Sequence, residues 1–175
     1  MLVPRGLLLA VVSQRRRRFS QVTSSIDSPK HTVLLVEDDP NDRLMTEHAF
    51  ERSAPGISLQ TAVDGEEAVA YLSGQGTYAD RATHPFPQLV LLDLKLPRKS
   101  GMEVLQWIRT EARLQTLVVF ILSSSQERAD IDRAFALGAT AYMVKQVELR
   151  AIREIVRGIG EYVRHLPRAT RAPGE

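Results

Sequence analysis

The sequence predicts an α/β fold in which five helices doubly wind a five-stranded parallel sheet, a (βα)5 arrangement. Two observations predict it. From His31 to Leu166, short apolar runs alternate five times with segments of helical periodicity. Successive parallel strands also need right-handed crossovers, which place helices on both faces of the sheet. The 175 residues suffice for one such domain with a sizeable core and are too few for two ordinary domains.

The first half of this region contains three apolar runs and two helix starts. Asp39 followed by Pro40 predicts a helix N-terminus, because aspartate accepts hydrogen bonds from free backbone amides and proline is favoured at the first helical position. Asp64, with Glu67 three residues later, is an acidic variant of the capping box and predicts a second helix. We expect the first three strands at Thr32–Val36, Ile57–Val63 and Leu89–Leu92.

The second half begins with a capping box, Ser100 with Glu103, which predicts the start of a third helix. A fourth helix is expected to be capped by Ser124 or Ser125 and stopped by Gly138. The remaining elements are two strands and a last helix with a long apolar stripe: Leu117–Leu122, Thr140–Val144 and Ile152–Leu166.

Three segments fall outside this pattern and divide the chain. Ser73–Gln88 is a sixteen-residue insertion whose glycines and prolines argue against a further regular element, and loops of this length are usually functional or disordered. Residues 1–30 are Arg- and Ser-rich; we expect a disordered leader or a mis-assigned start, with a transit peptide as the alternative. Residues 31–166 then form the domain, and residues 167–175 a flexible tail.

Composition and charge exclude several classes of protein. With 43% hydrophobic and 25% charged residues the chain is a globular type, and no apolar run is long enough to span a membrane. The absence of cysteine excludes disulfides, thiolate metal sites and cysteine nucleophiles. The net charge of +2 hides an acidic body, because residues 31–163 hold 14 basic and 19 acidic side chains. The basic residues of the ends are therefore weak evidence for DNA binding, and we expect none.

Polar residues follow four of the five predicted strands. In order along the chain they are Glu37-Asp38-Asp39, Asp93, Ser123 and Lys145. A sheet in the flavodoxin-like order 2-1-3-4-5 binds ligands beyond the carboxyl ends of its strands, at the switch point between the first and third. Asp38, Asp39 and Asp93 should therefore converge on one crevice. Each residue alone is explained by helix capping, loop chemistry or surface charge; the set of strand ends favours a functional site.

The chemistry of these residues points to phosphoryl transfer. Carboxylates held close together need a cation, and Mg²⁺ prefers one or two carboxylates, waters and a phosphate oxygen; Mn²⁺ or Ca²⁺ could substitute. Lys145 would supply a charge, and Ser123 a hydroxyl, to a phosphoryl oxygen. These are the parts needed to place a phosphoryl group on an aspartate.

The sequence resembles response-regulator receiver domains from His31 to about Leu166. The matching motifs are V-L-L-V-E-D-D at 33–39, L-V-L-L-D-L-K-L-P at 89–97, S-G-M-E-V-L at 100–105, I-L-S-S-S at 121–125 and G-A-T-A-Y-M-V-K at 138–145. The resemblance implies that Asp93 accepts a phosphoryl group from a phosphohistidine of a sensor histidine kinase. It further implies Mg²⁺ ligation by Asp39, Asp93 and the backbone carbonyl of Lys95, with Asp38 acting largely through water.

The same resemblance implies a switch rather than an enzyme, with at most slow self-dephosphorylation. Lys145 would pair with the phosphate, Ser123 would swing toward it, and Tyr142 would rotate inward behind Ser123. Gln146 departs from the family, which usually has proline there in a cis peptide bond; we expect a trans bond with a shifted loop or a strained cis bond.

A narrower resemblance, to single-domain regulators paired with phytochrome-type sensor kinases, rests on the insertion, on D-L-K-L-P and on the missing output domain. It implies a cytoplasmic homodimer formed by the fourth helix, fifth strand and last helix. The expected surface residues are Ile131, Phe135, Tyr142, Ile152, Ile159 and Tyr162. For the last helix, ordinary core packing is the competing interpretation.

Two rival functions are weaker. A metal-dependent phosphohydrolase with Asp93 as nucleophile needs a second aspartate two positions later as acid/base, and that position is Lys95, so its turnover should be slow. A DNA-binding regulator needs a helix-turn-helix domain, and few residues follow the last predicted helix.

Overall fold

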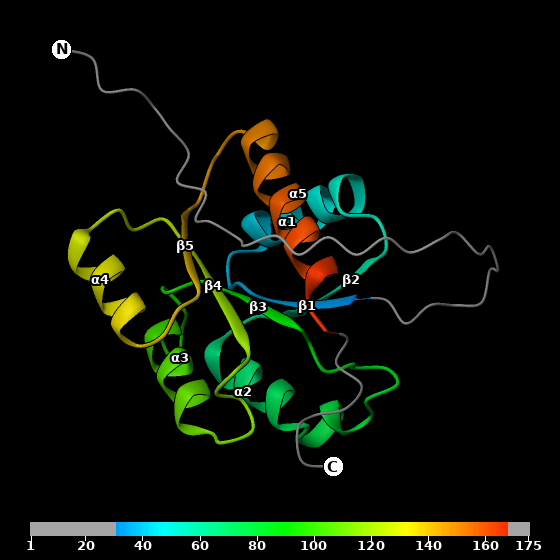
Figure 1. Ribbon diagram of the computed structural model, residues 1–175, viewed down its shortest axis with the longest axis vertical. Helices are drawn as coiled ribbons and strands as arrows, with labels where there is room; N and C mark the ends of the chain where they lie inside the picture. Colours follow the sequence, from blue (N-terminus) through cyan, green and yellow to red (C-terminus); the bar gives the residue numbers. More distant parts are fainter. Residues whose placement is uncertain (1–30, 168–175) are drawn as a thin grey trace.

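The computed structural model describes residues 31–167, so the expectations for residues 1–30 and 168–175 lie outside the described residues. Its elements alternate as predicted (Figure 1). The strands are β1 (His31–Val36), β2 (Ile57–Ala62), β3 (Leu89–Leu92), β4 (Val118–Ser123) and β5 (Ala141–Val144). The helices are α1 (Pro40–Ser53), α2 (Gly65–Ser73), α3 (Gly101–Thr110), α4 (Arg128–Ala136) and α5 (Leu149–His165). No helix within the described residues is long and apolar enough to cross a membrane.

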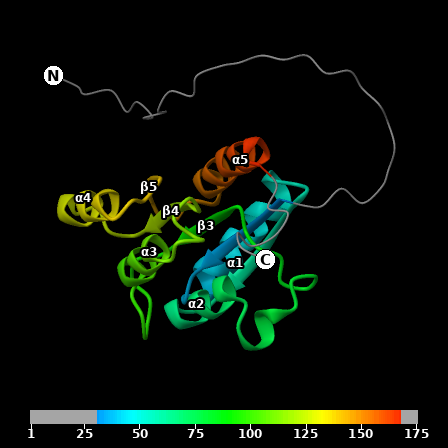
Figure 2. The same ribbon diagram turned by 60° about the horizontal axis from the view of Figure 1, so that its bottom comes forward.

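The five strands form one parallel sheet in the order β2-β1-β3-β4-β5, which confirms the predicted flavodoxin-like topology. Helices α1 and α5 cover one face and α2, α3 and α4 lie on the other (Figures 1 and 2). Side chains alternate between the two faces along each strand. In β1, for example, Leu34 and Val36 enter the core beneath α2 and α3, whereas Val33 and Leu35 enter the core beneath α1 and α5.

Helix α5 packs against α1 over the second of these cores. Val156, Ile159 and Val163 form its buried stripe, and Gly160 lies so close to α1 that a Cβ there would be 2.9 Å from the Cβ of Ala54. Ile159 is only 2% exposed. The expectation that Ile159 belongs to a partner surface is therefore wrong, because its side chain is used to join α5 to the sheet.

Two local predictions also differ from the structure. Helix α4 begins at Arg128 with Glu127 as N-cap, and neither Ser124 nor Ser125 caps it. Ser125 lies two residues before the N-cap position. Its Oγ accepts the amide of Glu127 at 3.3 Å and donates to Asp130 at 2.6 Å, and these two hydrogen bonds hold the turn before the helix.

The Ser73–Gln88 insertion contains a short 3-10 helix, η1 (Gly76–Ala79), where no regular element was expected. Arg81 fastens the insertion to α2, because its guanidinium donates to the carbonyl of Tyr71 at 2.8 Å and to that of Leu72 at 3.1 Å. Both carbonyls belong to the last turn of α2, where the Tyr71 carbonyl also accepts the amide of the C-cap residue Gly74 at 3.1 Å. The local sequence did not predict η1, because hydrogen bonds to residues distant in the chain hold this segment in place.

Candidate functional site

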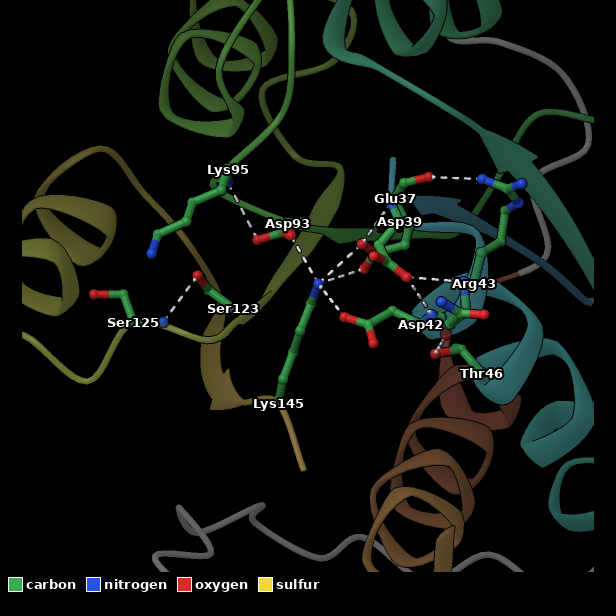
Figure 3. Close-up of polar contacts among 11 residues, drawn as sticks. Glu37, Asp39, Asp42, Arg43, Thr46, Asp93, Lys95, Ser123, Ser125 and Lys145 are labelled. Carbon is green, nitrogen blue, oxygen red and sulfur yellow. Dashed lines mark hydrogen bonds and ion pairs between the residues drawn. The ribbon is translucent and has the colours of Figure 1, made fainter. Parts of the chain in front are cut away.

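The candidate site lies at the carboxyl ends of β1, β3 and β5, in the loops that follow them (Figure 3). Because the strands are parallel, these ends meet at one edge of the sheet. The hydrogen-bonded ladder also continues one residue beyond the strands. Glu37 donates its amide to Ala62, Asp93 to Val36 and Lys145 to Ser123, at 3.0, 3.0 and 2.9 Å. The backbone of each residue is thus fixed by the sheet itself.

The Lys145 ammonium is the centre of the site. Its Nζ donates to Asp93 Oδ2 at 2.7 Å, contacts Glu37 Oε2 at 2.7 Å and donates to Asp42 Oδ2 at 2.9 Å, and its side chain is 16% exposed (Figure 3). Burial works against the charged form, but the hydrogen bonds that the ammonium donates to Asp93, Glu37 and Asp42 outweigh it and raise the pKa of Lys145 above its ordinary value. Lys145 is therefore a permanent cation at this site.

Glu37 is buried beside that ammonium, with 1% of the residue exposed. Burial raises the pKa of its carboxyl to about 7, although the hydrogen bond to Lys145 acts in the opposite direction. Because a buried carboxylate is costly to ionise alone, a further cation next to it stabilises its charged form. The chemistry of Glu37 thus favours a metal ion at this position.

Carboxylate oxygens of Glu37, Asp38 and Asp93 lie within 4.8 Å of one another and could hold a metal ion. All donors are carboxylate oxygens, the ligand type that hard divalent cations prefer. The cluster confirms the convergence expected for Asp38 and Asp93. It also contains Glu37, which the sequence analysis did not assign as a ligand.

Asp39, in contrast, is not one of these three carboxylates. Its Oδ1 accepts the amides of Asn41 at 2.8 Å and of Asp42 at 3.0 Å, which makes it the N-cap of α1. The same two hydrogen bonds lower the pKa of Asp39. The sequence indicates this capping role, because a proline at the first helical position, Pro40, makes the preceding residue the N-cap.

Asp42 is the other residue that the sequence analysis missed. It lies in the first turn of α1, where an acidic residue is explained by the helix dipole alone. Nothing local shows that its side chain reaches Lys145, 103 residues later in the chain.

The remaining predicted residues surround this centre. The Lys95 amide donates to Asp93 Oδ1 at 3.2 Å, and the Lys95 side chain is exposed. Ser123 is fully buried and its Oγ accepts the amide of Ser125 at 3.3 Å, while the Tyr142 hydroxyl donates to the carbonyl of Ser125 at 3.0 Å. Ser123 and Tyr142 are thus both bonded to Ser125.

The bond between Lys145 and Gln146 is trans, since no peptide bond within the described residues is cis. This is the first of the two alternatives expected from the missing proline.

The sequence pattern of the response regulator receiver domain matches residues 33–157. The chain belongs to this family. As a receiver domain it has the phosphoacceptor role in two-component signalling, and receiver domains bind a divalent metal ion, for which the acidic cluster is suited. The family acts as a phosphoacceptor switch.

Several relatives cover most of this chain. Response regulator Rcp1 of Synechocystis sp. is 32% identical over 139 residues, which are 79% of this chain and 92% of Rcp1. The Mn²⁺-bound form of Rcp1 superposes with a TM-score of 0.69 at 31% identity, over 79% of this chain and 98% of that structure.

Two further solved structures are similar. The phosphorylated cyanobacterial phytochrome response regulator RcpA has a TM-score of 0.71 at 35% identity, over 78% of this chain and 95% of RcpA. The bacteriophytochrome response regulator AtBRR has a TM-score of 0.62 at 37% identity, over 75% of this chain and 95% of AtBRR.

Proposed function

We propose that Asp93 is the phosphoacceptor and receives its phosphoryl group from a phosphohistidine of a sensor histidine kinase. One observation carries the proposal: the Asp93 carboxylate belongs to the acidic cluster and also lies 2.7 Å from the Lys145 ammonium. In the reaction an Asp93 oxygen bonds to phosphorus while the phosphorus–nitrogen bond breaks, and the imidazole nitrogen keeps the electron pair. The Lys145 ammonium, together with a divalent cation in the acidic cluster, would stabilise the oxygens of the transferring group.

For the metal we propose Mg²⁺, held by Asp38, Asp93 and the backbone carbonyl of Lys95, with Glu37 as the buried carboxylate beneath it. Mg²⁺ retains several waters and takes few carboxylates, which suits an open site with one exposed acid, Asp38. When bound, the ion supplies positive charge to the phosphoryl oxygens. Glu37, rather than Asp39, is thus the third carboxylate of the proposed site.

The response to phosphorylation is proposed to use three residues already near the site. A phosphoryl group adds a charge of about −1.5 to −2 and three acceptor oxygens. Lys145 is positioned to pair with it, and Ser123 is the last residue of the buried strand β4. For Tyr142 to rotate inward, its 3.0 Å hydrogen bond to Ser125 must break, which would couple β5 to the site. Lys95, two residues after Asp93, offers no acid for hydrolysis, so self-dephosphorylation should be slow.

The kinase partner is proposed to be of the phytochrome type, and the chain to act as a stand-alone regulator. The support is the similarity to RcpA and AtBRR, named as phytochrome and bacteriophytochrome response regulators, and the 92% coverage of Rcp1. A homodimer through α4, β5 and α5 is also proposed. Among the residues expected at this surface, Phe135 is 49% exposed, and four others are half-buried: Ile131, Tyr142, Ile152 and Tyr162. The cytoplasmic location stays a prediction.

Phosphorylation of Asp93 can be tested with acetyl phosphate and Mg²⁺ followed by intact-mass measurement. The wild type should gain one acid-stable, base-labile phosphoryl group, and Asp93→Asn should gain none. Asp132→Asn, which removes an exposed carboxylate of α4, is the matched control and should label like the wild type. Undiminished labelling of Asp93→Asn would refute the assignment. Light scattering that finds only monomer, with and without phosphorylation, would refute the dimer.

A further inference from the structure

Asp42 contacts the Lys145 ammonium from outside the metal cluster. Its Oδ2 lies 2.9 Å from Nζ, and it reaches the ammonium from a different side than Asp93 and Glu37 (Figure 3). Its backbone is fixed on both sides, because its amide donates to Asp39 at 3.0 Å and its carbonyl accepts the Thr46 hydroxyl at 2.8 Å. The side chain is 46% exposed, so Asp42 is the outer of the three partners of Lys145.

The other two partners of Lys145 are shared with the metal cluster. Glu37 and Asp93 both bond the ammonium, and both belong to the three carboxylates that could hold an ion. A divalent cation in the cluster would draw on the oxygens of these carboxylates and would repel the ammonium as a like charge. With only these two partners, Lys145 and the ion would oppose one another.

We propose that Asp42 is a positioning residue for Lys145, which it holds by a carboxylate outside the metal cluster so that ion and ammonium occupy the site together. The inference rests on the proposed metal site. Its consequence is that Asp42 should strengthen metal binding indirectly. The Asp42 carboxylate compensates part of the ammonium charge and gives Lys145 a bond that the incoming ion does not take away.

The test is calorimetric titration of Mg²⁺ into four proteins that form a double-mutant cycle: wild type, Asp42→Asn, Lys145→Met and the double variant. With Lys145 present, Asp42→Asn should weaken Mg²⁺ binding roughly three- to fivefold, the upper range for a partly exposed ion pair. With Lys145 replaced, the same change should weaken binding less than twofold. Circular dichroism checks folding, and Lys145→Gln provides a second background for the cycle.

Two matched variants on α1 complete the experiment. Asp42→Glu keeps the carboxylate and should bind Mg²⁺ within about twofold of the wild type. Glu51→Gln removes an equal charge nine residues further along α1, about 14 Å away along the helix axis. That distance exceeds the Debye length of about 10 Å at 0.1 M salt, so Glu51→Gln should leave Mg²⁺ affinity unchanged.

The outcomes separate this inference from the proposed function. If Asp42→Asn weakens Mg²⁺ binding equally in both backgrounds, or not at all, Asp42 does not act through Lys145 and the inference is overturned while the metal site stands. If the wild type binds no Mg²⁺, the metal site and the inference both fail. A larger loss in the presence of Lys145, rescued by Asp42→Glu, supports the positioning role.

Discussion

Gly101, the first residue of α3, offers a quantitative test of how tightly the loop that follows Asp93 is packed. A Cβ at this position would lie 2.0 Å from the backbone oxygen of Asp93 and 2.8 Å from the Cα of Leu94. Both are backbone atoms, so no side chain can rotate away. Gly101 also donates its amide to the Leu94 carbonyl at 3.0 Å, and relief of the clash would disturb this bond. We expect Gly101→Ala to lower the free energy of unfolding by about 2–3 kcal/mol, the upper range for overpacking.

The control for Gly101→Ala is Gly158→Ala in α5, where nothing lies within 4 Å of the added Cβ. That substitution should raise the free energy of unfolding by about 0.5–1 kcal/mol, because alanine is favoured over glycine inside a helix. Urea denaturation of both variants measures the two effects in opposite directions. Gly101→Ala should also label more slowly with acetyl phosphate, since the clash moves the backbone of Asp93. A Gly101→Ala protein as stable as the wild type would refute the reasoning.

Two further predictions concern the acidic residues. Asp38→Ala should weaken Mg²⁺ binding at least about tenfold. Asp39→Ala should lower the urea midpoint through loss of the α1 cap and leave Mg²⁺ affinity nearly unchanged, and calorimetry that finds the reverse order would identify Asp39 as the ligand. With a chelator present, the pKa of Glu37 is raised from 4.5 to about 7 in the folded state, so the folded state prefers the protonated acid. The contribution of Glu37 to the free energy of unfolding is therefore complete below pH 4.5 and is lost as the pH rises to about 7. The wild type should therefore lose roughly 3 kcal/mol of stability relative to Glu37→Gln between those pH values, and parallel pH profiles of the two proteins in urea denaturation would contradict this.

The topology was predictable because each strand is a short apolar run and each helix has its own start or stop signal. The placement of Asp93, Ser123 and Lys145 at strand ends followed from the same pattern, and the structure confirms those positions. The choice between Glu37 and Asp39 did not follow from an acidic triplet alone. It depended on the point where β1 ends and α1 begins, and Pro40 marks that point.

Other features could not be predicted because they depend on partners distant in the chain. The sequence of the α5 stripe is equally compatible with a core and with an interface. Only the fold shows that Ile159 lies in the core that α1 and α5 form with the sheet. The bond between Asp42 and Lys145, and that between Arg81 and α2, likewise join residues whose local sequence gives no sign of the contact.

The division of the interior into two cores by the sheet has a spectroscopic consequence. Trp107 is the single tryptophan of the chain, and it packs against the core beneath α2 and α3. Its fluorescence therefore reports on that side of the sheet. Rearrangements beneath α1 and α5, where Phe120 and Tyr162 have ring centroids 5.1 Å apart, would leave its emission unchanged. A tryptophan introduced at Tyr162 in a Trp107→Phe background would give the opposite side a signal of its own.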